Sequence, residues 1–220
     1  MTVVALVPAA GRGTRLGLDV PKAFVALHGR SLLEWAVGGL FASGAVDDVV
    51  VMVPDELVDG ARSLVPRARV VPGGAERTDS VRAGLAAAGR AELVLVHDAA
   101  RPLTPPAMIA RVVASLRGGA TAVIPALPVA DTVKRVTPDG AVVATVDRAD
   151  LRAVQTPQGF AADALRAAYD AAPGELATDD AGLVERAGGT VVTVPGDPLA
   201  MKITTAFDLR VAQALAEEQR

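Results

Sequence analysis

Short, continuous apolar runs constrain the fold of this chain most strongly, because they recur between stretches with helical spacing. Four such runs lie at 3–7, 49–53, 93–96 and 122–124. An unbroken apolar run, unlike an alternating one, is typical of a parallel strand that is buried on both faces. The alternation of strand and helix therefore predicts an α/β fold with a doubly wound, mostly parallel sheet.

The helices are predicted from capping residues as well as from spacing. Ser31 begins a capping box with Glu34, and Gly44 stands where that helix should end. Further helices are expected at 78–88, 105–116, 161–171, 180–187 and 205–218. We interpret Asp179 and Asp180 as charges that suit the amino end of a helix, and we place neither of them in a site.

Length and composition exclude several classes of protein. The chain has 220 residues, of which 51% are apolar, and this suits one domain over 1–220. No apolar stretch approaches the roughly 20 residues that span a bilayer, and no signal region is evident, so we expect a cytoplasmic protein without a membrane partner. The net charge of −3 and the lack of a basic run argue against nucleic-acid binding. Because cysteine is absent, disulfides and thiolate chemistry are excluded.

One segment, at about 131–148, interrupts the alternation of strands and helices. Two strand-like stretches flank Thr137-Pro138-Asp139-Gly140, and Pro-Asp-Gly is a turn sequence. Two strands alone are marginally stable in water, so the hairpin should pack on the rest of its own chain or on a partner. We expect a dimerisation arm, with a local flap as the alternative.

A glycine-rich loop, PAAGRGTRLGLDVPKAF, occupies 8–24. It is not a dinucleotide fingerprint, because Leu16 replaces the last glycine, and it lacks the Gly-Lys-Ser/Thr ending of a Walker loop. Glycines let backbone N–H groups approach a phosphate, which cations then neutralise. The residues that would do this are Gly11, Arg12, Gly13, Arg15 and Lys22. We expect a polyphosphate here, and the alternative is a plain turn with solvated charges.

A second loop, PGGAERTDS, occupies 72–80. Its two glycines precede polar side chains that open a helix. This arrangement suits binding of a base or a ribose through backbone groups, with Ser80 as a further hydrogen-bonding group. The alternative is a capped junction between loop and helix that has no function.

The stretch VHDAARP, at 96–102, places Asp98 just past a buried strand. Open α/β sheets bind ligands outside the carboxyl ends of their strands, and Mg²⁺ prefers one or two carboxylates plus substrate phosphates. We therefore predict a Mg²⁺ ion at Asp98 and a phosphate clamp at Arg101. His97 is equally well explained as a structural residue, and the one other histidine is His28, so we expect no histidine-based metal site.

Polar residues later in the chain add two cations and two hydroxyls. Two of them flank the hairpin, and the other two lie further along the chain. These residues are Thr132, Arg148, Thr156 and Lys202. Each alone is ordinary surface chemistry, but together they suffice to hold a second phosphorylated molecule facing the first.

Seven motifs occur in one order over nearly the whole chain. They are A-A-G-x-G-x-R with a following P-K, G-G-A-E-R-x-D-S, V-H-D-A-A-R-P, D-T-V-K-R, V-D-R, Q-T-P-Q and M-K-I-T. Together they resemble the 2-C-methyl-D-erythritol 4-phosphate cytidylyltransferase family. The resemblance implies a Rossmann-like nucleotidyltransferase fold, an exchanged homodimer arm, and transfer of CMP from CTP to methylerythritol phosphate in the non-mevalonate isoprenoid pathway.

The resemblance also implies a role for each matching residue. The catalytic residues would be Arg15, Lys22, Arg148 and Lys202. The nucleotide-binding residues would be Ala9, Ala10, Gly11, Gly13, Gly74, Ala75 and Ser80. The sugar phosphate and its Mg²⁺ would be surrounded by Asp98, Arg101, Thr132, Arg148, Thr156 and Lys202. Because the arm is exchanged in the family, Thr132 or Arg148 would serve the partner's site.

The expected reaction needs no general base. A phosphate monoester with a second pKa of roughly 6 is mostly dianionic at neutral pH, so cations are the main requirement. One alternative is a ribitol-5-phosphate cytidylyltransferase, which would use the same triphosphate loop. Another is a non-catalytic nucleotide-binding protein, which would be expected to lack one of Arg15, Lys22, Asp98 or Lys202.

Overall fold

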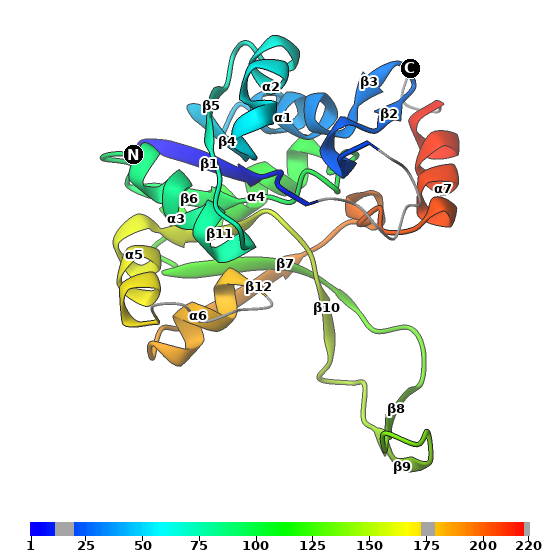
Figure 1. Cartoon of the computed structure of the whole chain (residues 1–220). Coiled ribbons are helices and arrows are strands. Elements are labelled where there is room, and N and C mark those ends of the chain that lie inside the picture. The colour runs from blue at the N-terminus through cyan, green and yellow to red at the C-terminus, as the bar shows by residue number, and fades with distance from the viewer. Residues whose placement is uncertain (12–19, 173–178, 218–220) are drawn as a thin grey trace.

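The computed structural model describes residues 1–11, 20–172 and 179–217. Within these residues, eight strands form one sheet in the order β10-β7-β11-β6-β1-β4-β5, with β12 paired to β7 (Figure 1). The strands are β1 (Val3–Pro8), β4 (Asp48–Val53), β5 (Arg69–Pro72), β6 (Leu93–Val96), β7 (Ala122–Pro128), β10 (Arg152–Val154), β11 (Gln158–Ala161) and β12 (Val191–Pro195). The predicted mostly parallel α/β sheet is confirmed.

Strand direction departs from the expectation at one place. The pairs β1·β4, β1·β6, β4·β5 and β7·β12 are parallel, whereas β10 and β11 run antiparallel to β7, and β11 also to β6. No helix intervenes between β7 and β10, and a parallel pair needs such a crossover. The chain therefore returns antiparallel through short, partly polar stretches that periodicity does not identify as strands.

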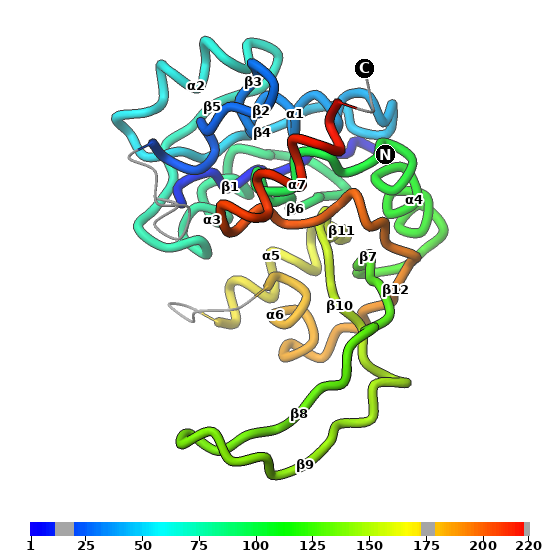
Figure 2. Tube along the Cα trace, turned by 90° about the vertical axis from the view of Figure 1, so that its right-hand side faces the viewer, coloured from blue at the N-terminus to red at the C-terminus, as the bar shows by residue number. Residues whose placement is uncertain are grey.

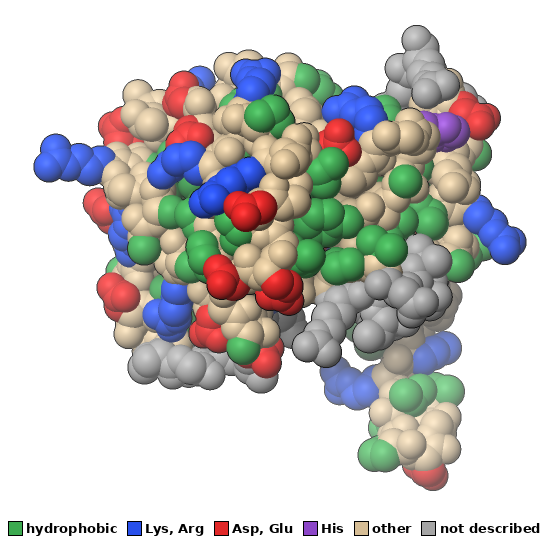
Figure 3. Space-filling view, turned by 45° about the horizontal axis from the view of Figure 1, so that its top comes forward, with side chains coloured by type: hydrophobic (Ala, Val, Ile, Leu, Met, Phe, Trp, Pro, Cys, Tyr) green, Lys and Arg blue, Asp and Glu red, His purple; other side chains and the backbone are tan. Residues whose placement is uncertain are grey.

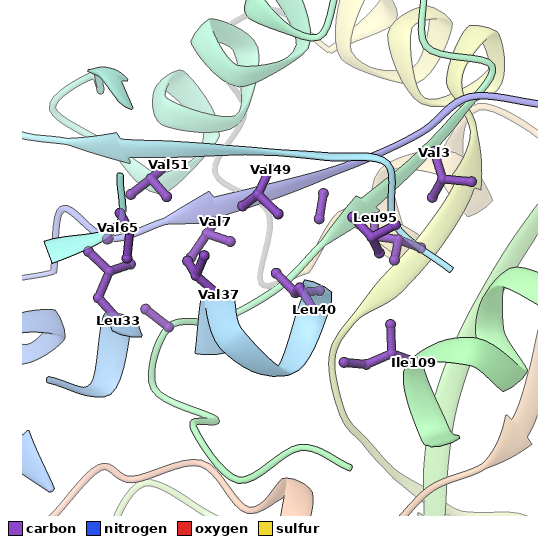
Figure 4. Packing of buried hydrophobic residues seen from close by; sticks show 14 of the residues in the cluster. Val3, Val7, Leu33, Val37, Leu40, Val49, Val51, Val65, Leu95 and Ile109 are labelled. Carbon is purple, nitrogen blue, oxygen red and sulfur yellow. The ribbon is translucent and has the colours of Figure 1, made fainter. Parts of the chain in front are cut away.

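Helices cover both faces of the sheet, as a doubly wound fold requires. On one face Val3, Ala5 and Val7 pack against α1 (Leu32–Ala42) and α4 (Pro106–Arg117), and Figure 4 shows Val7 beside Leu33, Val37 and Leu40. On the other face Val4 and Leu6 join a cluster that includes residues of three helices. Those helices are α3 (Arg77–Ala87), α5 (Ala162–Ala171) and α6 (Asp180–Arg186).

The helix boundaries follow the local sequence signals. Ser31 and Glu34 form the predicted capping box, and Gly44 adopts a φ of +63° just after α1. The other five predicted helices lie within one residue of their expected bounds, including α7 (Ala206–Glu217). The short helices are additional: α2 (Val58–Leu64), η2 (Lys22–Phe24), η3 (Asp55–Leu57) and η4 (Pro198–Ala200). None of the described helices is both long and apolar enough to cross a membrane.

A third apolar cluster packs the last helix of the chain against the amino-terminal part of the protein. Helix α7 packs on the small hairpin of β2 (Ala26–Leu27) and β3 (Arg30–Ser31), through a cluster that contains Leu27 and Ala212 (Figure 2). Ile203 is fully buried in this cluster, and its N–H donates to the carbonyl of Ala100 at 2.8 Å. The segment that carries Lys202 is thereby held beside the loop that follows β6.

The predicted hairpin forms a separate two-stranded sheet of β8 (Val133–Val136) and β9 (Val142–Val146). It projects from the body of the molecule (Figures 1 and 2). Gly140 closes the turn with a φ of +90°, a conformation that favours glycine. The hairpin exposes apolar side chains (Figure 3), and the large ones among them belong to Val136, Val142 and Val143. The hairpin itself is confirmed, whereas dimerisation through it and the single domain stay predictions.

Candidate active site

A cavity of about 490 Å³ opens at the carboxyl ends of β1 and β6. From β1 the chain first builds β4 and β5 on one side and then returns to β6 on the other. A crevice at such a switch point is the usual ligand site of an open α/β sheet. Eight residues singled out from the sequence line it: Ala9, Ala10, Gly11, Lys22, Ala75, Ser80, Asp98 and Lys202.

Backbone and small side chains form the wall predicted for the nucleotide. Ser80 is fully buried, and its hydroxyl accepts the N–H of Gly74 at 3.2 Å. A Cβ at Gly74 would stand 2.2 Å from the Cβ of Asp79, so the close approach of loop and helix requires glycine. Gly74 supports this wall but does not itself line the cavity.

Lys22 stands at the mouth of the first loop. Its backbone N–H donates to the carbonyl of Gly11 at 3.4 Å, which brings the two ends of the loop together. Across from it, Asp208 accepts N–H groups from Thr205 and Thr204, and these bonds, with the charge of Lys22, lower the pKa of the Asp208 carboxyl. Lys22 therefore lies between the first loop and the start of α7. The predicted residues Gly13 and Arg15 lie outside the described residues.

Asp98 is the central carboxylate of the cavity. One of its oxygens lies 2.7 Å from Nζ of Lys202 and 3.9 Å from Nε of Arg101. Burial by itself raises the pKa of Asp98, but Lys202, then Arg77 and Arg101, bring that pKa below its ordinary value. The carboxylate is therefore ionised at neutral pH.

The donor set around Asp98 fits a metal that takes most of its ligands from substrate and water. In the described part of the chain, no three His, Asp or Glu side chains gather into a metal-binding group. Mg²⁺ commonly binds through one or two carboxylates plus phosphate oxygens, and Asp98 supplies such a carboxylate on the cavity wall. The residues present therefore suit Mg²⁺ bound together with a polyphosphate.

Arg101 and Thr156 lie behind the cavity rather than on its wall. The Arg101 guanidinium is buried and donates to the carbonyls of Ala200, at 2.6 Å, and Val154, at 3.3 Å. A phosphate clamp would need these donors directed into the cavity, whereas Arg101 instead joins the segments that carry Ala200 and Val154. The Thr156 hydroxyl accepts the N–H of Asp98 and lies 3.0 Å from Nδ1 of His97.

His97 is a structural residue in this arrangement. Its side chain is fully buried, and burial lowers the pKa of the imidazole to about 4. The ring is therefore neutral at pH 7 and does not line the cavity.

Thr132 and Arg148 lie at the base of the projecting hairpin. Both are exposed, and the Arg148 guanidinium donates to the carbonyl of Ala130. Neither lines the cavity of its own chain. The structure therefore does not bring these two residues to the other predicted site residues within one protomer.

Arg77 and Thr204 line the cavity, although sequence reasoning gave them no role. Arg77 stands in the G-G-A-E-R motif, which is the signal that would have found it. Its partner is Asp180, which stands in the first turn of α6 as expected and is fully buried there against Arg77. Asp179 does cap α6 as expected, accepting the N–H of Gly182 at 3.1 Å.

A doubly wound sheet whose switch-point cavity combines close backbone walls, two lysines and an ionised carboxylate suits the binding of phosphate groups. These features are those expected of a nucleotidyltransferase. Gly11 and Lys22, which flank the predicted triphosphate loop, and Ala75 and Ser80 of the predicted wall for a base line this one cavity.

Comparison with known proteins gives the family. The model of the family described as 2-C-methyl-D-erythritol 4-phosphate cytidylyltransferase (IspD) matches residues 3–218. The enzyme of that name from Rhodococcus opacus strain B4 is 65% identical over 217 residues, covering 98% of this chain and 96% of the relative. The one from Nocardia farcinica is 63% identical over 221 residues, covering 99% and 95%.

Solved structures agree with the sequence relatives. The crystal structure of 2-C-methyl-D-erythritol 4-phosphate cytidylyltransferase from Thermus thermophilus superimposes with a TM-score of 0.83 at 40% identity, covering 99% of this chain and all of the other. This chain belongs to the 2-C-methyl-D-erythritol 4-phosphate cytidylyltransferase family.

Proposed function

We propose that this enzyme transfers the cytidylyl group of CTP to 2-C-methyl-D-erythritol 4-phosphate. The products are 4-diphosphocytidyl-2-C-methyl-D-erythritol and pyrophosphate, within the non-mevalonate isoprenoid pathway. The observation that carries the proposal is the convergence of Lys22, Asp98 and Lys202 on one cavity whose walls carry small residues such as Ala9, Ala10 and Gly11. Family membership supports the same two substrates.

In the proposed reaction, an oxygen of the sugar 4-phosphate attacks the α-phosphorus of CTP. The new bond joins that oxygen to the α-phosphorus, and the bond between the α-phosphorus and the bridging oxygen of pyrophosphate breaks. Because the attacking phosphate is already mostly dianionic at neutral pH, no proton has to be removed. The barrier arises from bringing two anions together, so positioned cations are the main catalytic requirement.

We assign the two lysines of the cavity to different parts of the reaction. Lys22 stabilises the charge that develops on the α-phosphate as pyrophosphate leaves, with Arg15 as its proposed neighbour in the first loop. Lys202 faces the second substrate. Mg²⁺ bound by Asp98 would neutralise phosphate oxygens and orient them. The cytosine and the ribose would contact Ala9, Ala10, Ala75 and Ser80, a wall that Gly74 supports, close to the proposed phosphate-binding Gly11 and Gly13.

The proposed enzyme is a cytoplasmic homodimer joined through the β8–β9 arm. Exposed valines on a projecting two-stranded sheet support this, because such a sheet is marginally stable on its own. Thr132 and Arg148 would then reach the sugar phosphate in the partner's cavity. Arg101 and Thr156 would support that pocket from behind, through the contacts described above.

Pyrophosphate release from CTP tests the function directly. The purified protein is given Mg²⁺ and CTP with either 2-C-methyl-D-erythritol 4-phosphate or ribitol 5-phosphate. Turnover with the first acceptor alone supports the proposal, and preference for the second would assign the other cytidylyltransferase activity. CTP binding without turnover for either acceptor would instead indicate a non-catalytic nucleotide-binding protein.

Loss of Arg148 or Lys202 should act on the acceptor rather than on CTP. Arg148→Ala and Lys202→Ala should each raise KM for the sugar phosphate by about tenfold, the cost of one lost contact to a charged group. Steady-state kinetics give that KM, and calorimetry gives the affinity for CTP, which should change little. Weaker CTP binding with an unchanged acceptor KM would contradict these assignments.

Mixing two impaired variants shows whether Arg148 acts across the dimer. Lys22→Ala and Arg148→Ala proteins are mixed, allowed to exchange subunits and assayed at an acceptor concentration well below KM, where the raised KM of Arg148→Ala lowers its rate. If Arg148 serves the partner's cavity, each mixed dimer contains one site with both residues intact, and the rate rises above the mean of the two separate variants. If Arg148 serves its own cavity, every site in the mixture carries a lesion and the rate stays at that mean.

Removal of the arm should abolish the dimer. A chain in which 133–146 are replaced by a short glycine linker should sediment as a monomer, whereas the intact chain sediments as a dimer. The change exposes no core residue, because the hairpin forms its own sheet. An intact dimer after this deletion would refute the role of the arm in dimerisation.

A further inference from the structure

Arg77 and Asp180 form a buried ion pair between two helices that are far apart in sequence. Nη1 and Nη2 of Arg77 each donate to a different carboxylate oxygen of Asp180, at 3.1 and 2.5 Å. Asp180 is completely buried, whereas the Arg77 side chain keeps 30% of its surface exposed. Burial by itself lowers the pKa of Arg77, but the charge of Asp180 more than offsets this, so the pKa lies above its ordinary value.

Further residues hold Asp180 in place. The hydroxyl of Tyr169 donates to Oδ1 of Asp180 at 2.6 Å, and the Tyr169 ring is almost fully buried. Oε1 of Gln158 accepts the backbone N–H groups of Asp180 and Ala181, at 3.1 and 3.0 Å. The carboxylate is therefore bonded by Tyr169 of α5 and by Arg77, while Gln158 of β11 fixes the backbone that carries it. Such full satisfaction by hydrogen bonds gives a buried charge a single position.

The exposed side of Arg77 faces the cavity. Arg77 lines it together with Ala75 and Ser80, on the wall proposed for the base and ribose. Its charge also contributes to the lowered pKa of Asp98, so the guanidinium lies near the proposed metal ligand. A guanidinium has five N–H donors, and among the described contacts the Asp180 carboxylate uses those of Nη1 and Nη2. The remaining N–H donors of Arg77 are therefore available to a bound nucleotide, at its ribose or its α-phosphate.

Stability alone does not account for a charged pair in this place. A buried pair is often no more stabilising than apolar side chains of similar volume, whereas losing one partner leaves an uncompensated charge. What the pair does provide is a fixed orientation for a planar cation, because a bidentate contact restrains the guanidinium in two directions.

We propose that Arg77 is a further nucleotide-binding residue of this site and that Asp180, backed by Tyr169, is its positioning residue. The inference rests on the proposed function, since it takes CTP as the ligand. The guanidinium donates to the ribose or α-phosphate of CTP from the wall that carries Ser80. Asp180 and Tyr169 touch no substrate, and they act by holding that donor group in place.

Calorimetric titration with CTP in the presence of Mg²⁺ tests the proposal on the intact chain. Arg77→Lys keeps a cation beside Asp180 but loses the planar fork, and it should weaken CTP binding about tenfold or more. Asp180→Asn keeps the volume and should also weaken it about tenfold. Tyr169→Phe loses one hydrogen bond to Asp180 and should weaken it by about threefold. The acceptor KM should stay within about twofold of the original value in all three.

A variant with a purely structural defect serves as the matched control. Ala168→Gly lies next to Tyr169 on the same helix and lowers stability through helix propensity without touching the pair. It should lower the melting temperature and leave CTP affinity unchanged. If Asp180→Asn fails to fold, Arg77→Lys and Tyr169→Phe decide the question. Wild-type CTP affinity in folded Arg77→Lys or Tyr169→Phe would overturn the proposal.

Failure of this inference is separable from failure of the proposed function. Wild-type protein that binds CTP but does not use the sugar phosphate would refute the proposed reaction, while the three variants would still report on the nucleotide contact. Wild-type protein that does not bind CTP at all would overturn both.

Discussion

Replacing Lys22 by alanine should lower kcat by about 100- to 1,000-fold, the usual cost of one well-placed donor to a developing charge. The ammonium of Lys22 is needed most in the transition state, in which five oxygens surround the α-phosphorus. It is needed less when CTP is bound in its ground state. Affinity for CTP should therefore fall much less than kcat. We propose this role because Lys22 lines the cavity at the mouth of the first loop, close to Gly11 and α7.

Steady-state pyrophosphate release and CTP titration measure the two quantities for Lys22→Ala. Arg62→Ala is the matched control, because Arg62 is an exposed cation on α2 that pairs only with the neighbouring Asp59 in the described contacts. The control should behave like the unaltered chain. A near-normal kcat in folded Lys22→Ala would remove Lys22 from the mechanism.

Replacing Asp98 by asparagine should lower kcat/KM by about 100-fold or more, because the proposed carboxylate ligand of Mg²⁺ is lost. The amount of Mg²⁺ that gives half of the maximal rate should rise as well. A second effect is expected, since Lys202 loses the carboxylate that lies 2.7 Å from its ammonium. Asparagine keeps the size of the side chain, so the fold should be little affected.

Pyrophosphate release at increasing Mg²⁺ concentrations measures this effect. Asp163→Asn is the control, because Asp163 is a fully exposed aspartate on α5 that lies outside the cavity. Its Mg²⁺ dependence should be unchanged. If Asp98→Asn showed the Mg²⁺ dependence of the unaltered chain, Asp98 would not be the metal ligand.

The predictable part of the fold follows from local chemistry. Continuous apolar runs predicted β1, β4, β6 and β7, and the Ser31 capping box predicted the start of α1 to the residue. Strand β11 carried no such signal. Its residues become a central strand because Phe160 and Gly159 fit between β6 and β7, where a Cβ on Gly159 would approach Val112 at 2.6 Å. That fit depends on elements distant in sequence, which no local pattern reports.

In the candidate site, too, some features could be predicted from the sequence and others could not. Lys22 and Asp98 follow predicted strands, and the rule that ligands bind at carboxyl ends predicted that they would lie in one cavity, as they do. Ser80 follows β5, which was not predicted, and its place in the cavity was expected only from its glycine-containing loop. The same rule did not show that Arg101 turns back to the carbonyls of Ala200 and Val154.

From the sequence alone, one can determine the alternation of strands and helices, the loops that follow each strand, and the kinds of charge those loops carry. Only the tertiary structure decided which charges face the cavity. Arg77 and Asp180 are 103 residues apart, and the direction of the guanidinium depends on a carboxylate that α5 and α6 bury together. Side-chain direction is set by packing partners, and those partners are distant in sequence and near only in the folded chain.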